Sequence, residues 1–466
     1  MATITCYGAA QEVTGSCHLL HTDNLSILFD CGLHQGGRVR RHLEADPFKF
    51  NPAAIDAVVL SHAHLDHSGR LPALVHEGFN GPIYCTHATA QLLPVMLHDA
   101  FSLYQSDLKR LNRKHQRQGK PLISERYSYE DIQTVLTLCK PKAFKEPFTI
   151  NKHINVTLFD AGHILGSAIT KATFTERGAS KTLVYSGDLG KHDTLLMNDP
   201  QVLEHADVVM MEGTYGDRDH RDLTDTLSQF KSILNEAYQR KGNALLPAFA
   251  VGRTQELLLY LGKLQHSGEL DDWTIFLDSP MAIEVTRIYD QWLTTLDCEG
   301  MESLSDGDAT LLKNFISSLH LTIEPEHSMA INNIRNRALI IAGSGMCTGG
   351  RITHHIRHRI WDKRNTIIFV GYQAQGTPGR ALVDGVKSIR LFGEDLQVNA
   401  SVETLGGFSA HAGQQELVNW LANFKPKPRV LLVHGEADAL DVLSEQIWQQ
   451  LDICSEIPFP GQMLAF

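Results

Sequence analysis

The chain has 466 residues, 43% hydrophobic and 20% charged, which suffices for about two to four folded domains and excludes a disordered protein. Its net charge of −11 argues mildly against a nucleic-acid partner. No apolar run reaches the ~18–20 residues of a membrane span, and the first residues lack a secretion signal. Eight cysteines without a CxxC pair indicate reduced thiols. We therefore expect a cytoplasmic protein without a membrane partner.

Short β-branched segments alternate with longer amphipathic segments along the chain, which is typical of a layered α/β protein. The predicted strands cover residues 25–30, 57–61, 182–187, 207–212, 243–248, 273–278, 337–342, 365–371 and 429–434. The predicted helices cover residues 88–120, 224–241, 253–265, 351–361, 414–424 and 439–450. Polar or glycine-bearing turns follow many of the strands, and ligands bind at such strand ends in open α/β sheets.

The densest chemical signal directly follows the predicted strand 57–61 and reads Ser61-His62-Ala63-His64-Leu65-Asp66-His67. Imidazole and carboxylate side chains together suit Zn²⁺ or a similar ion. The chain holds 24 histidines, but four potential ligands within six residues are too dense for histidines scattered through a polar loop. The segment therefore predicts a metal-binding loop that two ions could share.

A site for two ions needs further ligands, and we expect them in turns that follow strands. His163, Asp188 and His434 each stand in such a turn, and the Asp188 carboxylate could bridge two ions. Taken alone, each of these residues is more often a structural turn residue. Beside the HxHxDH segment, each supplies a missing ligand.

In these motifs the chain resembles the metallo-β-lactamase superfamily and, within it, the β-CASP nucleic-acid nucleases. The resemblance spans nearly the whole chain and implies an α/β fold, an αββα sandwich with an inserted α/β β-CASP domain. It implies two Zn²⁺ per chain, with Asp188 and a hydroxide bridging them. The implied ligands are His62, His64 and His163 for one ion, and Asp66, His67 and His434 for the other.

The family's first motif resembles Leu28-Phe29-Asp30-Cys31-Gly32, in which Asp30 would orient metal ligands from behind. By spacing alone, Asp30 is equally well explained as a turn residue before Gly32.

Three further segments resemble motifs A, B and C, which distinguish β-CASP proteins. They contain Glu212, His411 and His434, and a histidine at motif C accompanies RNA substrates in the family. About 250 residues separate Asp188 from His434, far more than one loop needs. We therefore expect a metallo-β-lactamase domain over residues 1–213, a β-CASP domain over 214–397, and a return to the first domain over 398–466.

The resemblance is to a shorter, bacterial branch related to the cleavage and polyadenylation factor. Because the family pattern begins at Thr3 and the chain stops at Phe466, we expect neither preceding KH modules nor a long C-terminal dimerisation domain. A homodimer is an expectation from the family alone.

These motifs predict a zinc-dependent ribonuclease that cleaves single-stranded RNA as an endonuclease, a 5′–3′ exonuclease or both. Asp66 is expected at the metal centre, and His411 is the expected general acid, oriented by Glu212. Two alternatives stay open: a small-ester or thioester hydrolase of the glyoxalase II type, and a zinc-bearing RNA-binding subunit without cleavage.

Two glycine-rich turns within residues 343–346 and 371–380 could cradle the phosphates of a substrate, with Ser344, Thr377 and Arg380 as contacts. Tight strand-to-helix turns explain these segments equally well. Two basic stretches, 108–120 and 351–364, run against the acidic average, and each alone is more simply a solvated helix face.

Overall fold

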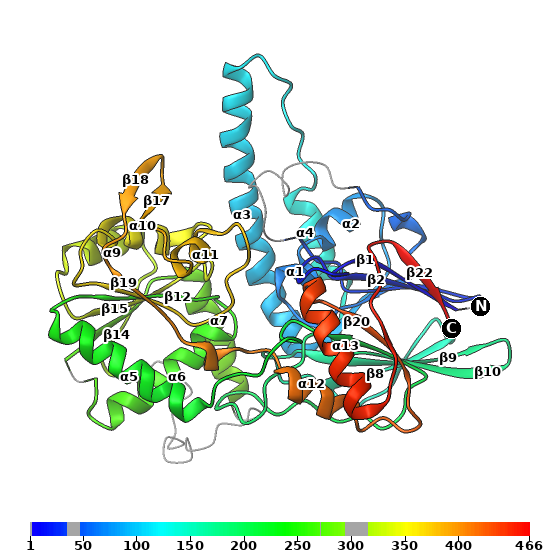
Figure 1. The fold of residues 1–466 in the computed structure, drawn as a ribbon. Helices are drawn as coiled ribbons and strands as arrows, with labels where there is room; N and C mark the ends of the chain where they lie inside the picture. Colours follow the sequence, from blue (N-terminus) through cyan, green and yellow to red (C-terminus); the bar gives the residue numbers. More distant parts are fainter. Residues whose placement is uncertain (1, 35–46, 271, 294–315) are drawn as a thin grey trace. The chain divides into compact units, whose positions relative to one another are not determined.

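The computed structural model describes residues 2–34, 47–270, 272–293 and 316–466 (Figure 1). The chain forms two compact units, and each is described by itself. Unit 1 comprises residues 1–193, 197–219 and 411–466, and unit 2 comprises residues 194–196 and 220–410. Within the described ranges, no helix combines the length and the apolar composition that crossing a membrane requires.

Unit 1 is built on two seven-stranded sheets. In sheet order, the first contains β22 (Gln462–Ala465), β1 (Thr3–Gly8), β2 (Cys17–His21), β3 (Ser26–Phe29), β4 (Ala57–Val59), β5 (Ile83–Thr86) and β6 (Cys139–Lys142). The second contains β21 (Ser455–Glu456), β20 (Arg429–Val433), β11 (Val208–Glu212), β10 (Ala179–Tyr185), β9 (Ala168–Glu176), β8 (Ile154–Asp160) and β7 (Phe148–Ile150). Strands β10, β11 and β20 run parallel to one another, so their carboxyl ends lie at the same sheet edge.

Alternating side chains of each strand divide between an inner and an outer core, as the period of two requires. Ile27 and Phe29 of β3 pack between the two sheets, whereas Leu28 packs outward. Helices cover both outer faces and complete the expected αββα sandwich (Figure 1). They are α1 (Leu65–Ser68), α2 (Leu71–His76), α3 (His87–Arg117) and α4 (Tyr129–Leu138) on the first sheet, and α12 (Gln414–Leu421) and α13 (Ala437–Leu451) on the second.

Unit 2 is a three-layered α/β unit around one parallel six-stranded sheet. In sheet order, its strands are β14 (Leu319–Leu321), β13 (Thr274–Leu277), β15 (Ala338–Ala342), β12 (Ala244–Pro247), β16 (Thr366–Phe369) and β19 (Ser401–Thr404). One face packs on α5 (Leu223–Gln239), α6 (Arg253–His266) and α7 (Pro280–Trp292), and the other on α10 (Gly350–Arg359) and α11 (Pro378–Val383). The short α9 (Pro325–Ala330) precedes β15, and β17 (Ser388–Leu391) pairs with β18 (Glu394–Gln397) as a hairpin.

Each predicted strand and helix coincides with an observed element, with ends that differ by a few residues. The compact units change over at residues 219/220 and 410/411, whereas we expected domain boundaries at 213/214 and 397/398. Strand β19, expected in the returning segment, pairs with β16 and lies in unit 2.

The fully buried Ile340 lies at the centre of β15, opposite Leu245 of β12 and Phe276 of β13. We expect Ile340→Ala to lower the free energy of unfolding of unit 2 by about 2–5 kcal/mol, because a cavity forms between sheet and helices. Chemical denaturation measures this loss. The control Ile323→Ala, at a side chain that is 45% exposed, is expected to change stability by less than about 0.5 kcal/mol. Equal losses in both variants would contradict the assignment of Ile340 to the core.

Candidate active site

The predicted metal ligands meet at the carboxyl ends of strands from both sheets of unit 1. The HxHxDH segment follows β4 and continues into α1, whose first turn contains Asp66 and His67. His163 lies between β8 and β9, Asp188 follows β10, and His434 follows β20. The side chains of His62, His67, His163, Asp188 and His434 are at most 3% exposed, so water contributes little to their surroundings.

The first group of donor atoms consists of Nε2 of His62, Nδ1 of His64, Nε2 of His163 and Oδ2 of Asp188. His64 Nδ1 lies 3.1 Å from the His62 nitrogen and 3.3 Å from the His163 nitrogen. Asp188 Oδ2 lies 3.5 and 3.6 Å from the same two nitrogens. A tetrahedral ion with bonds of ~2.0–2.1 Å separates its ligands by ~3.3–3.4 Å. These four atoms could therefore hold one ion.

The second group uses the other oxygen of the same carboxylate. Asp188 Oδ1 lies 3.2 Å from Nε2 of His67, and that nitrogen lies 3.1 Å from Nε2 of His434. Asp66 Oδ2 lies 3.7 Å from the His434 nitrogen. Asp188 thus faces one donor group with each oxygen and is placed to bridge two ions.

The protons on the histidine rings indicate that these groups suit a cation. His67 Nδ1 donates to Asp30, and His434 Nδ1 donates to the Oγ1 of Thr214, whose hydroxyl is committed to the carbonyl of His434. If both rings are neutral, each carries one N–H, and the two Nε2 atoms, 3.1 Å apart, would turn lone pairs toward each other; a shared proton or a bound cation between them relieves this. Burial alone lowers the pKa of His67, but the Asp188 and Asp30 carboxylates outweigh it and raise that pKa well above its usual value. The pocket therefore favours positive charge, as a metal site requires.

Asp30 lies behind the ligands and is fully buried. Its carboxylate accepts four hydrogen bonds of 2.7 Å, from the Ser61 amide, the Ser61 hydroxyl, His67 Nδ1 and the Tyr185 hydroxyl. The Ser61 oxygen in turn lies 3.0 Å from Nδ1 of His62, so Asp30 orients one ligand directly and another through a serine. The motifs gave no indication of these roles for Ser61, Tyr185 and Thr214, although Ser61 begins the segment Ser61–His67 and Thr214 stands two residues after Glu212.

Glu212 and His411 form a second functional pair beside the ligands. Nδ1 of His411 lies 3.1 and 3.2 Å from the two oxygens of the fully buried Glu212 carboxylate, which also accepts the Leu189 amide at 2.6 Å. The His411 ring centroid lies 4.4 Å from that of His163. Burial lowers the pKa of His411, but Glu212, with Asp188 and Asp66, outweighs it and raises that pKa to about 9. The arrangement favours a protonated imidazole that can act as an acid.

Two glycines permit the loops to approach one another this closely. A Cβ atom on Gly32 would lie 1.6 Å from the carbonyl oxygen of Asp66, and one on Gly190 would lie 2.1 Å from that of Gly162. Gly32 thus lets the turn after Asp30 pack on the HxHxDH segment, and Gly190 lets the Asp188 loop pack on the His163 loop. Any larger residue would displace a ligand-bearing backbone.

The three predicted substrate contacts belong to unit 2, whereas the donor groups belong to unit 1. The Thr377 hydroxyl donates to the carbonyl of Ala374 and accepts the Arg380 amide, so it caps α11. Arg380 pairs with Asp384 at 2.8 Å, and Ser344 accepts the amide of Thr348. These contacts give the residues local structural roles, and their contact with a substrate stays a prediction.

Asp30→Asn tests whether this carboxylate orients the metal ligands. The amide nitrogen cannot accept the hydrogen bonds that the lost oxygen received, so we expect metal affinity to fall by about 10–100-fold. Competition with a chelator of known affinity measures it. The control Tyr185→Phe removes one of the four donors and leaves both Ser61 and His67 in place, so its loss should be smaller. Unchanged affinity in Asp30→Asn would contradict the role of Asp30.

Three family models match segments of this chain. Residues 10–277 match the metallo-beta-lactamase superfamily, residues 254–382 the Beta-Casp domain, and residues 395–458 the Zn-dependent metallo-hydrolase RNA specificity domain. "Ribonuclease TTHA0252" of Thermus thermophilus is 39% identical over 95% of both chains. "Transcription termination factor FttA" of Methanocaldococcus jannaschii is 31% identical over 93% of this chain and 67% of its own length.

Among solved structures, a protein of unknown function from Enterococcus faecalis V583 has a TM-score of 0.53 at 13% identity and covers 99% of both chains, which supports the fold alone. The family matches and the level of identity lead to one conclusion. This chain belongs to the metallo-β-lactamase superfamily, in its β-CASP branch, and is a metal-dependent hydrolase.

Proposed function

We propose that this protein is a zinc-dependent ribonuclease that hydrolyses the phosphodiester bonds of single-stranded RNA in the cytoplasm. The observation that carries the proposal is the single buried carboxylate of Asp188, faced by a separate donor group at each oxygen, with the Glu212–His411 pair beside it. The match to an RNA specificity domain, and a relative named as a ribonuclease, support RNA as the substrate.

His62, His64, His163 and Asp188 would hold one zinc ion, and Asp66, His67, His434 and Asp188 the other. Such a pair supplies a water whose pKa is lowered to near ~7 and offsets the charge on the phosphate. The chain's own part is to fix seven side chains around two points. Asp30, Ser61 and Thr214 contribute by accepting the Nδ1–H of three of the five ligand rings, those of His67, His62 and His434.

His411 is the proposed proton donor to the leaving group. Glu212 engages its Nδ1, so Nε2 on the opposite side of the ring would deliver the proton. Attack of water on phosphorus breaks the bond to the 3′-oxygen, and that oxygen takes the proton as it departs. The products are a 3′-hydroxyl and a 5′-phosphate. Cuts inside the RNA and cuts from its 5′ end both follow from this chemistry.

The first test compares cleavage of a 5′-labelled single-stranded RNA with cleavage of a DNA of the same sequence. For the wild type, we expect RNA cleavage with two zinc ions per chain. Asp66→Ala should lose cleavage and one of the ions, because the second donor group then lacks the carboxylate that lies beside His434. Chelation should abolish cleavage and added Zn²⁺ should restore it. Full zinc occupancy without cleavage of RNA would contradict the proposal.

A second test isolates the proton donor. His411→Ala should slow cleavage of ordinary RNA by about 10²–10⁴-fold, the usual contribution of general acid catalysis. In an RNA whose scissile 3′-oxygen is replaced by sulfur, the leaving group is a thiolate, whose conjugate acid has a far lower pKa and which needs no proton donor. His411→Ala should therefore slow cleavage of this RNA much less. Equal losses on both substrates would assign His411 another role, and Glu212→Gln should follow the His411 variant with a smaller effect.

A further inference from the structure

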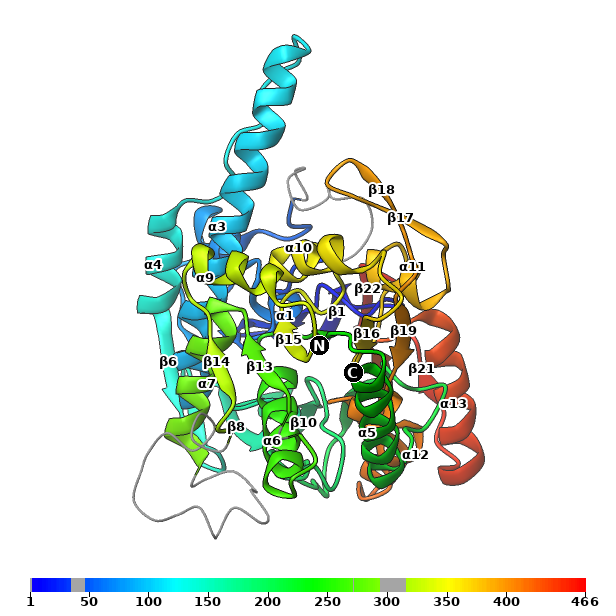
Figure 2. The same cartoon turned by 90° about the vertical axis from the view of Figure 1, so that its left-hand side faces the viewer.

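The distal half of α3 projects beyond the rest of unit 1 (Figures 1 and 2). Its first turn packs on the loop that bears His163, where the hydroxyls of Thr86 and Thr89 both donate to the carbonyl of Gly166, at 2.7 and 2.9 Å. At 1.5 Å per residue, position 109 lies ~33 Å further along the helix. Helix α3 therefore begins beside the loop that bears His163, and its projecting half lies far from that loop.

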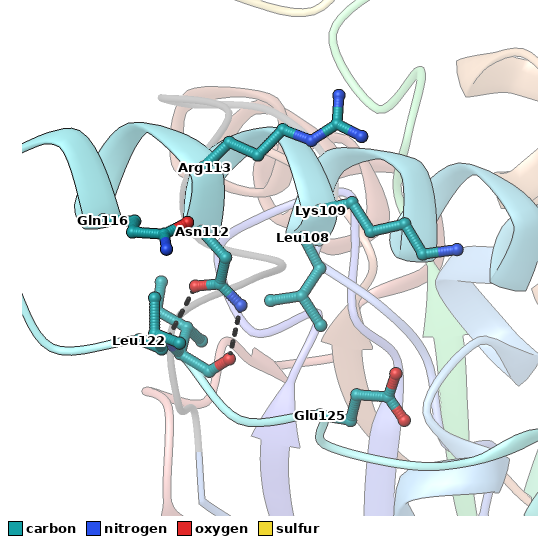
Figure 3. A pocket seen from close by; sticks show the side chains of 8 residues that line it. Leu108, Lys109, Asn112, Arg113, Gln116, Leu122 and Glu125 are labelled. Atoms are coloured by element: carbon teal, nitrogen blue, oxygen red, sulfur yellow. Dashed lines mark hydrogen bonds between the residues drawn. The ribbon is translucent and has the colours of Figure 1, made fainter.

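This projection is a folded element, because the returning chain is fastened to the helix. Asn112 donates to the carbonyl of Ile123 and accepts its amide, both at 2.8 Å (Figure 3). His115 donates to the carbonyl of Pro121 at 2.7 Å, and the Tyr104 hydroxyl accepts the amide of Arg126 at 2.7 Å. Side chains on this helix are therefore presented on a fixed scaffold.

The projection is strongly basic in an acidic protein. Between residues 101 and 128 the chain holds seven Lys and Arg against two acidic residues, whereas the whole chain has a net charge of −11. Lys109, Arg113, Lys114, Arg117 and Lys120 are all exposed. Within the described part of the chain, none of these five has an ion-pair partner, and Arg110 pairs only with Asp107.

Helix capping explains only part of this charge. Cations in the last turn interact favourably with the helix dipole, which accounts for Lys114 and Arg117. Arg113 lies just before the last turn and Lys109 lies more than a full turn before it, so the dipole accounts for little of their charge. Together with Glu125 they line an open cavity of about 300 Å³ whose apolar wall includes Leu108 and Leu122. Figure 3 shows the Arg113 side chain directed away from the returning segment, and the Lys109 side chain extended along the helix. The exposed cations on this part of α3 suit the phosphates of a polyanion such as RNA.

We propose that the surface formed by Lys109, Arg113, Lys114 and Arg117 binds the phosphates of an RNA segment remote from the scissile bond. The inference rests on the proposed function and extends it, because it makes affinity depend on RNA length. A short RNA that fills the metal centre does not reach a surface ~33 Å or more along α3, and a long RNA does.

The test is the triple variant Lys109→Gln, Arg113→Gln and Lys114→Gln, since glutamine retains helix propensity. The matched control Lys140→Gln, Lys152→Gln and Arg177→Gln removes the same charge from exposed positions elsewhere in unit 1. Both zinc-loaded variants and the wild type are assayed for binding and cleavage of unstructured RNAs of about 6 and about 40 nucleotides. For the long RNA, we expect the affinity of the α3 variant to fall by about 10-fold or more. We also expect the slope of log affinity against log salt concentration to become less steep by about 2.

With the short RNA, the α3 variant should match the wild type in kcat and KM, and the control should match it on both RNAs. Equal loss in variant and control would show a general charge effect and overturn the proposal. Unchanged affinity of the α3 variant for long RNA would also overturn it and assign the surface to another partner, such as an acidic protein. If the wild type cleaves neither RNA but the long RNA still binds through α3, the proposed function fails and this inference stands.

Discussion

The architecture of unit 1 depends on one buried carboxylate that must face two donor groups at once. Asp188 can do so only if the loops after β4, β8, β10 and β20 end at one place. Parallel pairing of β10, β11 and β20 brings Asp188, Glu212 and His434 to one edge, with Glu212 opposite Val433 in register. The chain leaves this sheet after β11 and returns at β20, so residues 220–410 of unit 2 are inserted in the chain between two neighbouring strands of a fixed register.

Around this carboxylate, hydrogen bonds decide which nitrogen faces inward for three of the ligand rings, whereas Nε2 of His64 has no hydrogen-bond partner within the described part of the chain. Ser61 takes Nδ1 of His62, Asp30 takes Nδ1 of His67, and Thr214 takes Nδ1 of His434. Glu212 does the same for His411, which contacts the ring of His163. The Nδ1–H of each of these four rings thus points away from the centre of the site, and Nε2 faces the centre with a lone pair or, in His411, with a proton that could be transferred. In the proposed function, the same device would serve both metal binding and acid catalysis, so that few side chains could sustain both.

How far the sequence predicts this arrangement depends on how local each signal is. The HxHxDH segment, the strand-end turns and the amphipathic helices are local, so the predicted ligands, the αββα sandwich and most elements could be read from the chain. Tyr185 could not be assigned to Asp30, because the two residues meet only when the two sheets stack. Likewise, β19 follows the inserted segment closely in sequence but pairs with β16, and pairing partners of short strands carry little local signal. Thr377 and Arg380 stood in a turn with phosphate-binding character, yet their observed contacts are those of a helix cap and an i, i+4 ion pair.

Charge is distributed so that chemistry and attraction occur at different places. The candidate active site is rich in carboxylates, and Asp30, Asp66, Asp188 and Glu212 would repel a polyanion if nothing balanced them. Bound cations can balance that charge locally, but they are surrounded by buried side chains and contribute little to collecting a substrate at a distance. Exposed cations on α3 differ in both respects: they attract anions through water over a Debye length of ~8–10 Å, and they need no precise geometry to do so. An acidic hydrolase that acts on a long anionic chain therefore benefits from a basic surface outside the pocket, held on a rigid helix that begins beside the His163 loop.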